Sequence, residues 1–433
     1  MNRKEQHESN IFFHIDVNSA FLSWSAVKRL NAGDSADLRT IPSVIGGDSS
    51  KRHGIVLAKS IPAKAFGITT GEPLAAAVRK CPSLVIEPPD HHYYSEQSRL
   101  LMAYLGSICP EIEQVSVDEC YMDYTPVSAN YESPEAAADI IRTQVRERFG
   151  YTVNVGISDR KVLAKMASDF EKPDKVHTLY LREVPAKMWP LPISDLFMCG
   201  KSSVHALQNL GIRTIGELAN ADPEVIALNL KSHGRLLYDF ANGRDFSPVE
   251  TVHPDRKGVG NSTTLPRDLT EARDAYPVLL SLAESVAARL RRAGKLCSSV
   301  SVEIRSSTFV NSSHQMLLPA PTDLADEIYL YARRLFDTLW NHDPIRLLGI
   351  RTTRLTNSGE PEQLDLFSLG LQQASDTHPR DTAPETAPVV SREQSEKLRK
   401  LAAAMDSIRS RYGENAIRRA SDRHFSGHAE KDT

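Results

Sequence analysis

Three carboxylates stand where apolar segments of the sequence end. Asp16 lies near the end of the run IFFHIDV, and Asp118 and Glu119 follow the alternating segment EQVSV. A carboxylate in such a place is costly unless it is solvated, paired or bound to a metal ion. If the two strands are neighbours in one sheet, the carboxylates converge, and a hard divalent cation relieves their repulsion. Two Mg²⁺ ions about 3.5–4 Å apart would suit in-line phosphoryl transfer. The alternative is three unrelated surface acids at strand ends.

Lysines in two further segments could meet a triphosphate. Lys59 and Lys64 lie in a segment broken by glycine and proline, and Lys161 and Lys165 lie on an expected helix after Gly156. A lysine neutralises phosphate as a point charge. For each of these lysines the alternative is a solvated helix face.

The elements that must position these residues follow an α+β order. Apolar patterning predicts strands at 11–17 and 153–155, a strand or hairpin at 113–124, and helices at 18–30, 91–109, 134–149 and 161–170. Ser19 stands where it could cap the first of these helices. No βα repeat of the kind that builds a barrel is present. Short helices are expected over 185–250, and α+β structure returns over 258–356, with strands in VGNSTTLP and CSSVSVEIR and helices at 276–293 and 323–340.

Length and composition exclude several classes of protein. The 433 residues predict two to four domains, and the formal net charge of −3 excludes a globally polybasic chain but not a local DNA-binding face. No apolar run reaches ~18 residues, so no membrane span is expected. The first ten residues are polar and lack the apolar core of a signal peptide, so none is expected there. The five cysteines are widely spaced without a CxxC pair, which argues against a disulfide framework or a zinc site and fits a reducing cytoplasm.

The composition changes after Thr356. Residues 357–391 are rich in Pro, Ser, Thr, Asp and Gln without sustained periodicity, and they predict a flexible linker. One apolar island, QLDLF at 363–367, lies within it. Residues 392–412 regain helical periodicity and predict a small amphipathic helix.

Three ordered motifs resemble the core motifs of the Y-family DNA polymerases, in particular their DNA polymerase IV-like branch. The motifs are IDVNSAFLSW at 15–24, SVDECYMDY at 116–124 and GISDRKVLAKMASDFEKP at 156–173. Together with HGIVLAKSIPAKAFGITTGEP at 53–73, the resemblance extends in order over about residues 11–356. Three motifs in the proper order are specific, whereas a lone Asp-Glu pair would not be.

The resemblance implies a right-hand polymerase with a ferredoxin-like palm, small fingers, a helical thumb and an α+β little finger. The palm falls on residues 11–25 and 86–175, the fingers on 26–85, the thumb with a helix-hairpin-helix-like motif on 176–250, and the little finger on 256–356. The linker 357–391 and a C-terminal helical segment, 392–425, follow.

The resemblance also implies a site for two Mg²⁺ ions and a deoxynucleoside triphosphate. The metal ligands fall on Asp16, the Val17 carbonyl, Asp118 and Glu119. The steric gate, whose ring excludes a 2′-hydroxyl, falls on Phe21. The residues expected to contact the triphosphate are Lys64 and Lys165, with Ser60 at the start of the same turn as Lys64.

Three positions depart from the family's pattern. A tyrosine common in the fingers is Ile61 here, which puts a hydroxyl contact to phosphate in question. The residue after Val17 is often Asp and is Asn18 here, but it is not one of the three required ligands. In the helix-hairpin-helix-like stretch 196–218, Met198 replaces the first glycine, so a weaker backbone contact to phosphate is expected.

The function implied is template-directed DNA synthesis of the error-prone, translesion type, without proofreading, in DNA damage tolerance and repair. The expected partners are primer–template DNA and a sliding clamp, and the chain is expected to be a cytoplasmic monomer that binds no membrane. The clamp would be contacted through Gln363, Leu364, Leu366 and Phe367. One alternative is a nucleotidyl cyclase, which would not need the thumb or the little finger. The other is a catalytically inactive DNA-binding scaffold, which the intact acidic triad disfavours.

Overall fold

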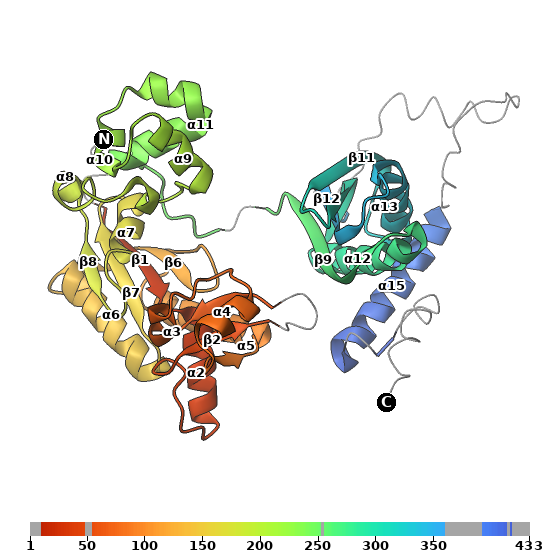
Figure 1. Ribbon diagram of the computed structural model, residues 1–433. Helices are drawn as coiled ribbons and strands as arrows, with labels where there is room; N and C mark the ends of the chain where they lie inside the picture. The colour runs from red at the N-terminus through yellow and green to blue at the C-terminus, as the bar shows by residue number, and fades with distance from the viewer. Residues whose placement is uncertain (1–9, 48–53, 253–254, 360–391, 414–415, 418–433) are drawn as a thin grey trace, which may run out of the picture. The chain divides into compact units, whose positions relative to one another are not determined.

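A computed structural model describes residues 10–47, 54–252, 255–359, 392–413 and 416–417. The chain divides into two compact units (Figure 1), the first ending at Pro254 and the second beginning at Asp255. The finer division of the first unit into palm, fingers and thumb remains a prediction. Among the described residues, no helix is long and apolar enough to cross a membrane.

A five-stranded sheet with the strand order β5-β6-β1-β7-β8 organises the first unit (Figure 1). Its central strand, β1, is antiparallel to both of its neighbours, β6 and β7. The strands are β1 (Phe12–Val17), β5 (Ile112–Gln114), β6 (Glu119–Asp123), β7 (Val153–Ser158) and β8 (Val176–Thr178). The apolar run that predicted a buried strand therefore forms the middle of the sheet, as the pattern indicated.

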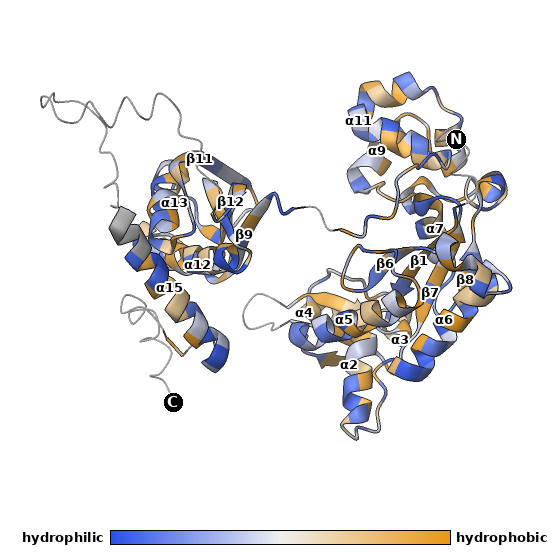
Figure 2. Cartoon of the chain, turned by 180° about the vertical axis from the view of Figure 1, so that it is seen from behind, coloured by the Kyte–Doolittle hydropathy of each residue, from blue (hydrophilic) through white to orange (hydrophobic). Residues whose placement is uncertain are grey.

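The two faces of β1 carry different kinds of side chain, because successive side chains along a strand point to opposite faces of the sheet. Phe13, Ile15 and Val17 face a core shared with α2 (Ala20–Asn31), α5 (His91–Ile108) and α6 (Pro134–Phe149). His14 and Asp16 therefore lie on the opposite face of the sheet. Helix α6 begins and ends where the sequence predicts, with the Ser133 hydroxyl accepting a hydrogen bond from the Ala136 amide. Figure 2 shows hydrophobic and hydrophilic residues interleaved along this amphipathic helix.

Helix α7 (Lys161–Ser168) packs directly on β7 because Gly156 has no side chain. A Cβ atom at Gly156 would lie 2.0 Å from the Ala164 carbonyl oxygen and 2.5 Å from the Ser168 amide nitrogen. Gly156 pairs with His14 across the β1–β7 ladder. The absence of a side chain at one position thus brings α7 close to the polar face of β1.

A smaller three-stranded sheet, with the order β3-β2-β4, follows α2 in the chain. Its elements are β2 (Ser43–Gly46), β3 (Val56–Lys59), α3 (Ile61–Ala65), α4 (Leu74–Lys80) and β4 (Val85–Glu87). The expectation that Ser19 caps α2 is wrong. Ser19 has φ 47° and ψ 53° and its side chain makes no capping hydrogen bond. The tight β1–α2 turn places Ser19 in the left-handed region instead.

The last part of the first unit consists of short helices, as the sequence predicts. They are η3 (Leu181–Glu183), α8 (Val184–Lys187), η4 (Ile193–Asp195), α9 (Lys201–Asn209), α10 (Ile215–Ala219) and the longer α11 (Pro223–Ala241). One further 3-10 helix, η2 (Thr125–Asn130), lies earlier in the chain, between β6 and α6. Helix α11 is kinked at Lys231, which has φ 55° and ψ −140°. Met198, in the hairpin before α9, has a φ of 67°. A side chain at this φ is strained, so the position favours the glycine that Met198 replaces.

The second unit is a four-stranded antiparallel sheet with the order β11-β10-β12-β9, covered by two helices. The elements are β9 (Gly258–Leu269), α12 (Ala272–Arg292), β10 (Lys295–Ser306), β11 (Asn311–Thr322), α13 (Ala325–Leu339) and β12 (Ile345–Asn357). The sequence predicted β9, β10 and both helices. It missed β11, which is mostly exposed and polar, and β12.

The predicted C-terminal helix forms as α15 (Arg392–Tyr412), and it packs on the second unit (Figure 1). Asp406 accepts two hydrogen bonds from the Arg291 guanidinium of α12, at 2.7 and 3.1 Å. Two further ion pairs, both at 3.0 Å, join Arg399 to Asp323 and Arg409 to Glu284. Helical periodicity predicted the helix but not this docking. The QLDLF segment at 363–367 lies outside the described residues.

Candidate active site

The sheet brings the three predicted carboxylates to one place. Asp16 pairs with Glu119 across the β1–β6 ladder. The Val17 amide donates to the Asp118 carbonyl oxygen at 3.0 Å, which fixes the β5–β6 turn beside the end of β1. The two strands are therefore neighbours, which is the condition under which the sequence predicted convergence.

Each carboxylate is held by a cation or a hydroxyl. Glu119 accepts from the Lys165 ammonium at 2.9 Å, and Asp16 accepts from the Lys172 ammonium at 2.6 Å. Asp118 accepts from the Ser116 hydroxyl at 2.5 Å. As they stand, no three His, Cys, Asp or Glu side chains of the described residues are arranged to hold a metal ion. The ammonium groups draw the acidic side chains toward themselves.

Glu119 is the most strongly compensated carboxylate. A hydrogen bond with His14, together with Lys165, lowers the pKa of Glu119 to about 2. His14 is 1% exposed, and burial lowers the pKa of its imidazole. The Nδ1 atom of His14 lies 2.8 Å from the Ser168 hydroxyl on α7. Helix α7 therefore fixes both groups that hold Glu119.

Asp118 has the opposite electrostatic surroundings. Burial raises the pKa of Asp118, the charges of Asp16 and Glu119 raise it further, and the Ser116 hydroxyl only partly opposes them. A carboxylate that is buried beside two other carboxylates favours a nearby cation.

The two lysines stay charged in spite of their surroundings. Burial works to lower the pKa of Lys165, but the hydrogen bond to Glu119 and the charge of Asp16 outweigh it, so the pKa is raised. Burial is likewise outweighed at Lys172, where Asp16 and Asp169 raise the pKa. The site thus carries fixed charges of both signs.

The donor set suits a hard divalent cation. Carboxylate and main-chain carbonyl oxygens are the ligands that Mg²⁺ prefers. The β1–β6 pairing places Asp16 opposite Glu119, and Asp118 precedes Glu119 in the chain, so all three lie at the same end of the sheet. Binding would require the side chains to turn from their ammonium partners. The residues therefore fit a metal ion chemically, at the cost of exchanging ion pairs.

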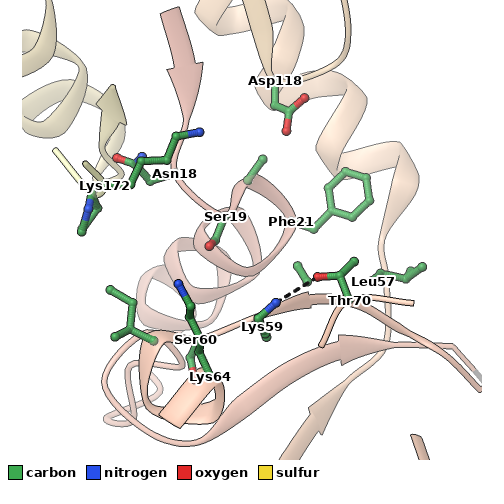
Figure 3. A pocket seen from close by; sticks show the side chains of 14 residues that line it. Asn18, Ser19, Phe21, Leu57, Lys59, Ser60, Lys64, Thr70, Asp118 and Lys172 are labelled. Carbon is green, nitrogen blue, oxygen red and sulfur yellow. Dashed lines mark hydrogen bonds between the residues drawn. The ribbon is translucent and has the colours of Figure 1, made fainter. Parts of the chain in front are cut away.

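A cavity of about 430 Å³ opens beside these carboxylates (Figure 3). Asp118 and Phe21 lie on one side of it and Asn18 and Lys172 on the other, as Figure 3 shows. The lining residues are Asn18, Ser19, Ala20, Phe21, Leu57, Ala58, Lys59, Ser60, Ile61, Lys64, Thr70, Asp118, Lys172 and Pro173. The volume and the mixed charges suit a small polyanion.

An aromatic cluster holds Phe21 at the cavity wall. The ring of Phe21 stacks on Tyr94 with centroids 4.5 Å apart, and meets His91 edge-on at 5.8 Å. The Tyr94 hydroxyl lies 2.6 Å from the Ser25 hydroxyl, so the stacking partner is fixed in turn. Phe21 is therefore a supported ring rather than a mobile side chain.

The turn between β3 and α3 supplies the cations on another side of the cavity. The Ser60 hydroxyl accepts from the Ala63 amide at 3.0 Å and donates to the Ile41 carbonyl at 2.8 Å. Ser60 thus shapes the turn that carries Lys64. Ile61 is 63% exposed at the cavity and has no hydroxyl to offer. Lys59 donates to the Thr70 hydroxyl at 3.3 Å (Figure 3).

A pair of buried amides ties the loop after α7 to the end of β1. Asn154 donates through Nδ2 to the carbonyls of Ser168 and Glu171, at 3.0 and 2.6 Å. Its Oδ1 atom must therefore be an acceptor, and it accepts a hydrogen bond from the Nδ2 of Asn18 at 3.1 Å. The Oδ1 of Asn18 in turn accepts from the Asp174 amide at 2.9 Å. Because each amide oxygen faces donors and each amide nitrogen faces an acceptor, neither amide can be turned over.

The sequence missed several residues of the site. His14 could have been found, because it shares a strand face with Asp16 two positions later. Lys172 lies inside a quoted motif, but its loop gives no periodic signal. Asn154 contacts Asn18 across 136 residues of sequence, so only the fold shows that the two are partners. Conversely, Lys161 does not face the cavity, since its ammonium binds Glu113 at 2.5 Å.

Comparisons with known proteins agree on one family. The impB/mucB/samB family matches residues 15–169, and the C-terminal domain of that family matches residues 256–366. The chain is 44% identical over 412 residues to the DNA polymerase IV of Clostridium acetobutylicum, covering 95% of this chain and 98% of that protein. It is 37% identical over 367 residues to DNA polymerase IV 1 of Bacillus subtilis, covering 84% and 86%. A solved Y-family DNA polymerase chimera has the same fold, with a TM-score of 0.70 and 21% identity, over 80% of this chain and 99% of that one.

The amide pair predicts that Asn18→Asp destabilises the protein, although Asp is the common residue in the family pattern. A carboxylate at residue 18 cannot donate, so it would face the Oδ1 acceptor of Asn154. Loss of the bond in a buried site should cost about 1–3 kcal/mol, or roughly 2–4 °C of the melting midpoint per kcal/mol. Thermal unfolding measures it, with the exposed Asn229→Asp as the matched control. Equal midpoints for the two variants would contradict the network.

Proposed function

Because the chain belongs to the impB/mucB/samB family and has the Y-family DNA polymerase fold, we infer that it is a DNA-directed DNA polymerase of the translesion type. It adds deoxynucleotides to a primer 3′-OH on a DNA template and serves DNA damage tolerance and repair. The observation that carries this conclusion is the 44% identity across 98% of a DNA polymerase IV. A nucleotidyl cyclase is excluded by the same membership.

Like its relatives, the enzyme depends on divalent metal ions. We propose that two Mg²⁺ ions are held by Asp16, Asp118, Glu119 and the carbonyl of Val17. Bound there, such ions would stabilise the negative charge on the reacting phosphate and would lower the pKa of the primer 3′-hydroxyl. The residues orient this centre: β1 and β6 fix Asp16 opposite Glu119, and the Ser116 hydroxyl aims the Asp118 carboxylate.

The cavity of about 430 Å³ is proposed to bind the incoming deoxynucleoside triphosphate. Phe21, held by its stack on Tyr94, would contact the sugar and exclude a 2′-hydroxyl. Lys64 would contact the triphosphate from the fingers, and Lys165 would contact it from α7. Ser60 would act by shaping the turn before Lys64.

Primer–template DNA binding follows from the family. We propose that the hairpin before α9 contributes a backbone contact to a DNA phosphate, with Gly200 and Lys201 at the start of the helix. The Met198 side chain is 53% exposed in this hairpin and would keep the phosphate at a greater distance.

A sliding-clamp contact through residues 363–367 is also proposed. The position of the peptide in the chain supports this proposal, because Gln363 comes only a few residues after Asn357, where β12 ends. The covalent chain alone keeps it within on the order of 20 Å of that strand end. A clamp-bound peptide would therefore hold the polymerase near the primer end by effective concentration.

The metal assignment predicts that Asp118→Ala abolishes incorporation while primer–template binding is largely retained, since DNA is held mainly by backbone contacts elsewhere. Primer extension should fall by about 10³-fold or more, given the size of charge stabilisation in active sites. Fluorescence anisotropy with labelled DNA measures binding. Asp139→Asn, a 60% exposed carboxylate on α6, is the control. Near-normal extension by Asp118→Ala would refute the assignment, and an inactive wild-type chain would indicate a DNA-binding scaffold.

The steric-gate assignment predicts that Phe21→Ala admits ribonucleotides. Removing the ring leaves room for a 2′-hydroxyl, so the ratio of incorporation efficiencies for deoxy over ribo triphosphates should fall about 10-fold or more. Single-turnover extension with each nucleotide gives the ratio. Phe66→Ala removes an exposed aromatic at the end of α3 and should leave the ratio unchanged. A ratio for Phe21→Ala equal to that of the control would make Phe21 a core aromatic only.

The clamp assignment predicts that Leu366→Ala with Phe367→Ala removes stimulation by a loaded clamp but spares synthesis on short primers. These side chains would bury apolar surface worth ~25 cal/mol per Å² in the complex. The matched control is Leu369→Ala with Leu371→Ala, which removes two apolar side chains just outside the peptide. Titration calorimetry measures clamp affinity. Wild-type affinity of the Leu366 and Phe367 double variant would count against the peptide.

A further inference from the structure

We propose that His14 is a positioning residue, whose Nε2–H group fixes the rotation of the Glu119 carboxylate so that Glu119 Oε1 is presented to a divalent metal ion. The proposal rests on the proposed metal site and adds to it a residue outside the expected ligand set. His14 would touch neither the metal ion nor the nucleotide, and it would act only through Glu119.

The strand register brings His14 and Glu119 together. His14 lies two positions before Asp16 on β1, so the two side chains share one face of the sheet. On the neighbouring strand β6, Asp16 pairs with Glu119 and His14 pairs with Tyr121. The Tyr121 ring meets the imidazole edge-on, with centroids 4.8 Å apart, and the imidazole Nε2 lies 3.4 Å from Glu119 Oε2. The imidazole is therefore held within reach of the carboxylate.

The two oxygens of the Glu119 carboxylate differ in their surroundings. His14 Nε2 and Lys165 Nζ both contact Oε2, at 3.4 and 2.9 Å, and Oε1 takes part in neither contact. One donor comes from β1 and the other from α7, so together they restrict rotation of the carboxylate about its last bond. Lys165 is itself proposed to turn to the triphosphate. His14 is then the donor that keeps Oε2 in place and leaves Oε1 to the cation.

The hydroxyl of Ser168 decides which imidazole nitrogen carries the hydrogen. A carboxylate oxygen only accepts, so Nε2 must be the donor toward Glu119, and Nδ1 of the uncharged ring is then an acceptor. The Ser168 Oγ atom lies 2.8 Å from Nδ1 and also 2.8 Å from the Lys165 carbonyl oxygen. Of these two acceptors, only Nδ1 leaves Nε2 as the donor when Ser168 binds it. Ser168, His14 and Glu119 thus form one directed chain of hydrogen bonds.

The backbone preorganises this chain. Gly156 faces His14 across the β1–β7 ladder, and a Cβ atom there would lie 2.5 Å from the Ser168 amide nitrogen. The missing side chain therefore lets Ser168 approach the imidazole. Asn154 donates to the Ser168 carbonyl at 3.0 Å, and the Ser168 side chain is buried. Outer groups held in this way are the ones that orient a metal-binding side chain.

The proposal predicts that His14→Leu weakens metal binding although it changes no metal ligand. Leucine is similar in size to histidine but has no donor, so Glu119 would be free to turn toward Lys165. Mn²⁺ binding to the full-length polymerase without nucleotide should weaken about 10-fold or more. Electron paramagnetic resonance of free Mn²⁺ measures the constant independently of activity. His14→Gln restores an N–H donor near the position of Nε2 and should bind Mn²⁺ within about threefold of wild type.

Ser168→Ala tests the same chain without altering the imidazole. It should weaken Mn²⁺ binding in the wild type but have no further effect in the His14→Leu protein, because the two residues act through one hydrogen bond to Glu119. The matched control is Ser158→Ala, which removes a buried hydroxyl of β7 that donates to the Leu179 carbonyl at 2.6 Å. This control should lower the thermal midpoint and leave Mn²⁺ affinity unchanged.

Four results would overturn the role of His14. They are Mn²⁺ affinity of His14→Leu within twofold of wild type or tighter, equal weakening by His14→Gln and His14→Leu, equal affinities of Ser168→Ala and Ser158→Ala, and additive effects of the His14 and Ser168 substitutions. A wild-type protein that binds no Mn²⁺ would refute the proposed metal site and this role with it. A wild-type protein that binds Mn²⁺ but extends no primer would instead refute the proposed function alone.

Discussion

The structure of the first unit depends on keeping three carboxylates together at one end of a sheet. Two like charges about 4 Å apart repel by roughly 4 kcal/mol at an effective dielectric constant of about 20. A folded domain is stable by only about 5–15 kcal/mol in total, so such repulsion must be compensated. Lys165, Lys172 and His14 supply the compensation, and all three contact Asp16 or Glu119. The same charges that destabilise the fold are the ones that we propose to hold the metal ions.

Close packing of α7 on the sheet makes this compensation possible. Because Gly156 has no side chain, the backbone of α7 at Ala164 can approach β7 closely, and α7 therefore lies near the polar face of β1. Lys165 and Ser168 extend from that helix toward Glu119 and His14. The charge cluster is therefore a consequence of backbone proximity, and a side chain at Gly156 would separate the lysine from the carboxylates even though it touches neither.

Elements encoded by a local sequence pattern could be predicted from the sequence, whereas contacts between distant residues could not. The apolar run ending at Asp16, the hairpin carrying Asp118 and the helix at 134–149 were predicted because each is encoded in consecutive residues. The docking of α15 through Arg291 and Asp406 was not, because its partners lie 115 residues apart. Strand β11 was missed for another reason: its polar, exposed residues lack the alternation that burial imposes.

The departures from the family's pattern differ in physical kind. Asn18 is part of a closed hydrogen-bond network, in which the amide of Asn154 demands a donor at residue 18. An Asp at that position would suit only a different partner at 154, so the two residues must be judged together. Ile61 belongs to no such network. It removes a hydroxyl from the cavity wall, where the remaining polar contacts come from charged side chains on other elements. A change of residue at position 18 is thus constrained by stability, whereas the exposed side chain at position 61 has no such network to preserve.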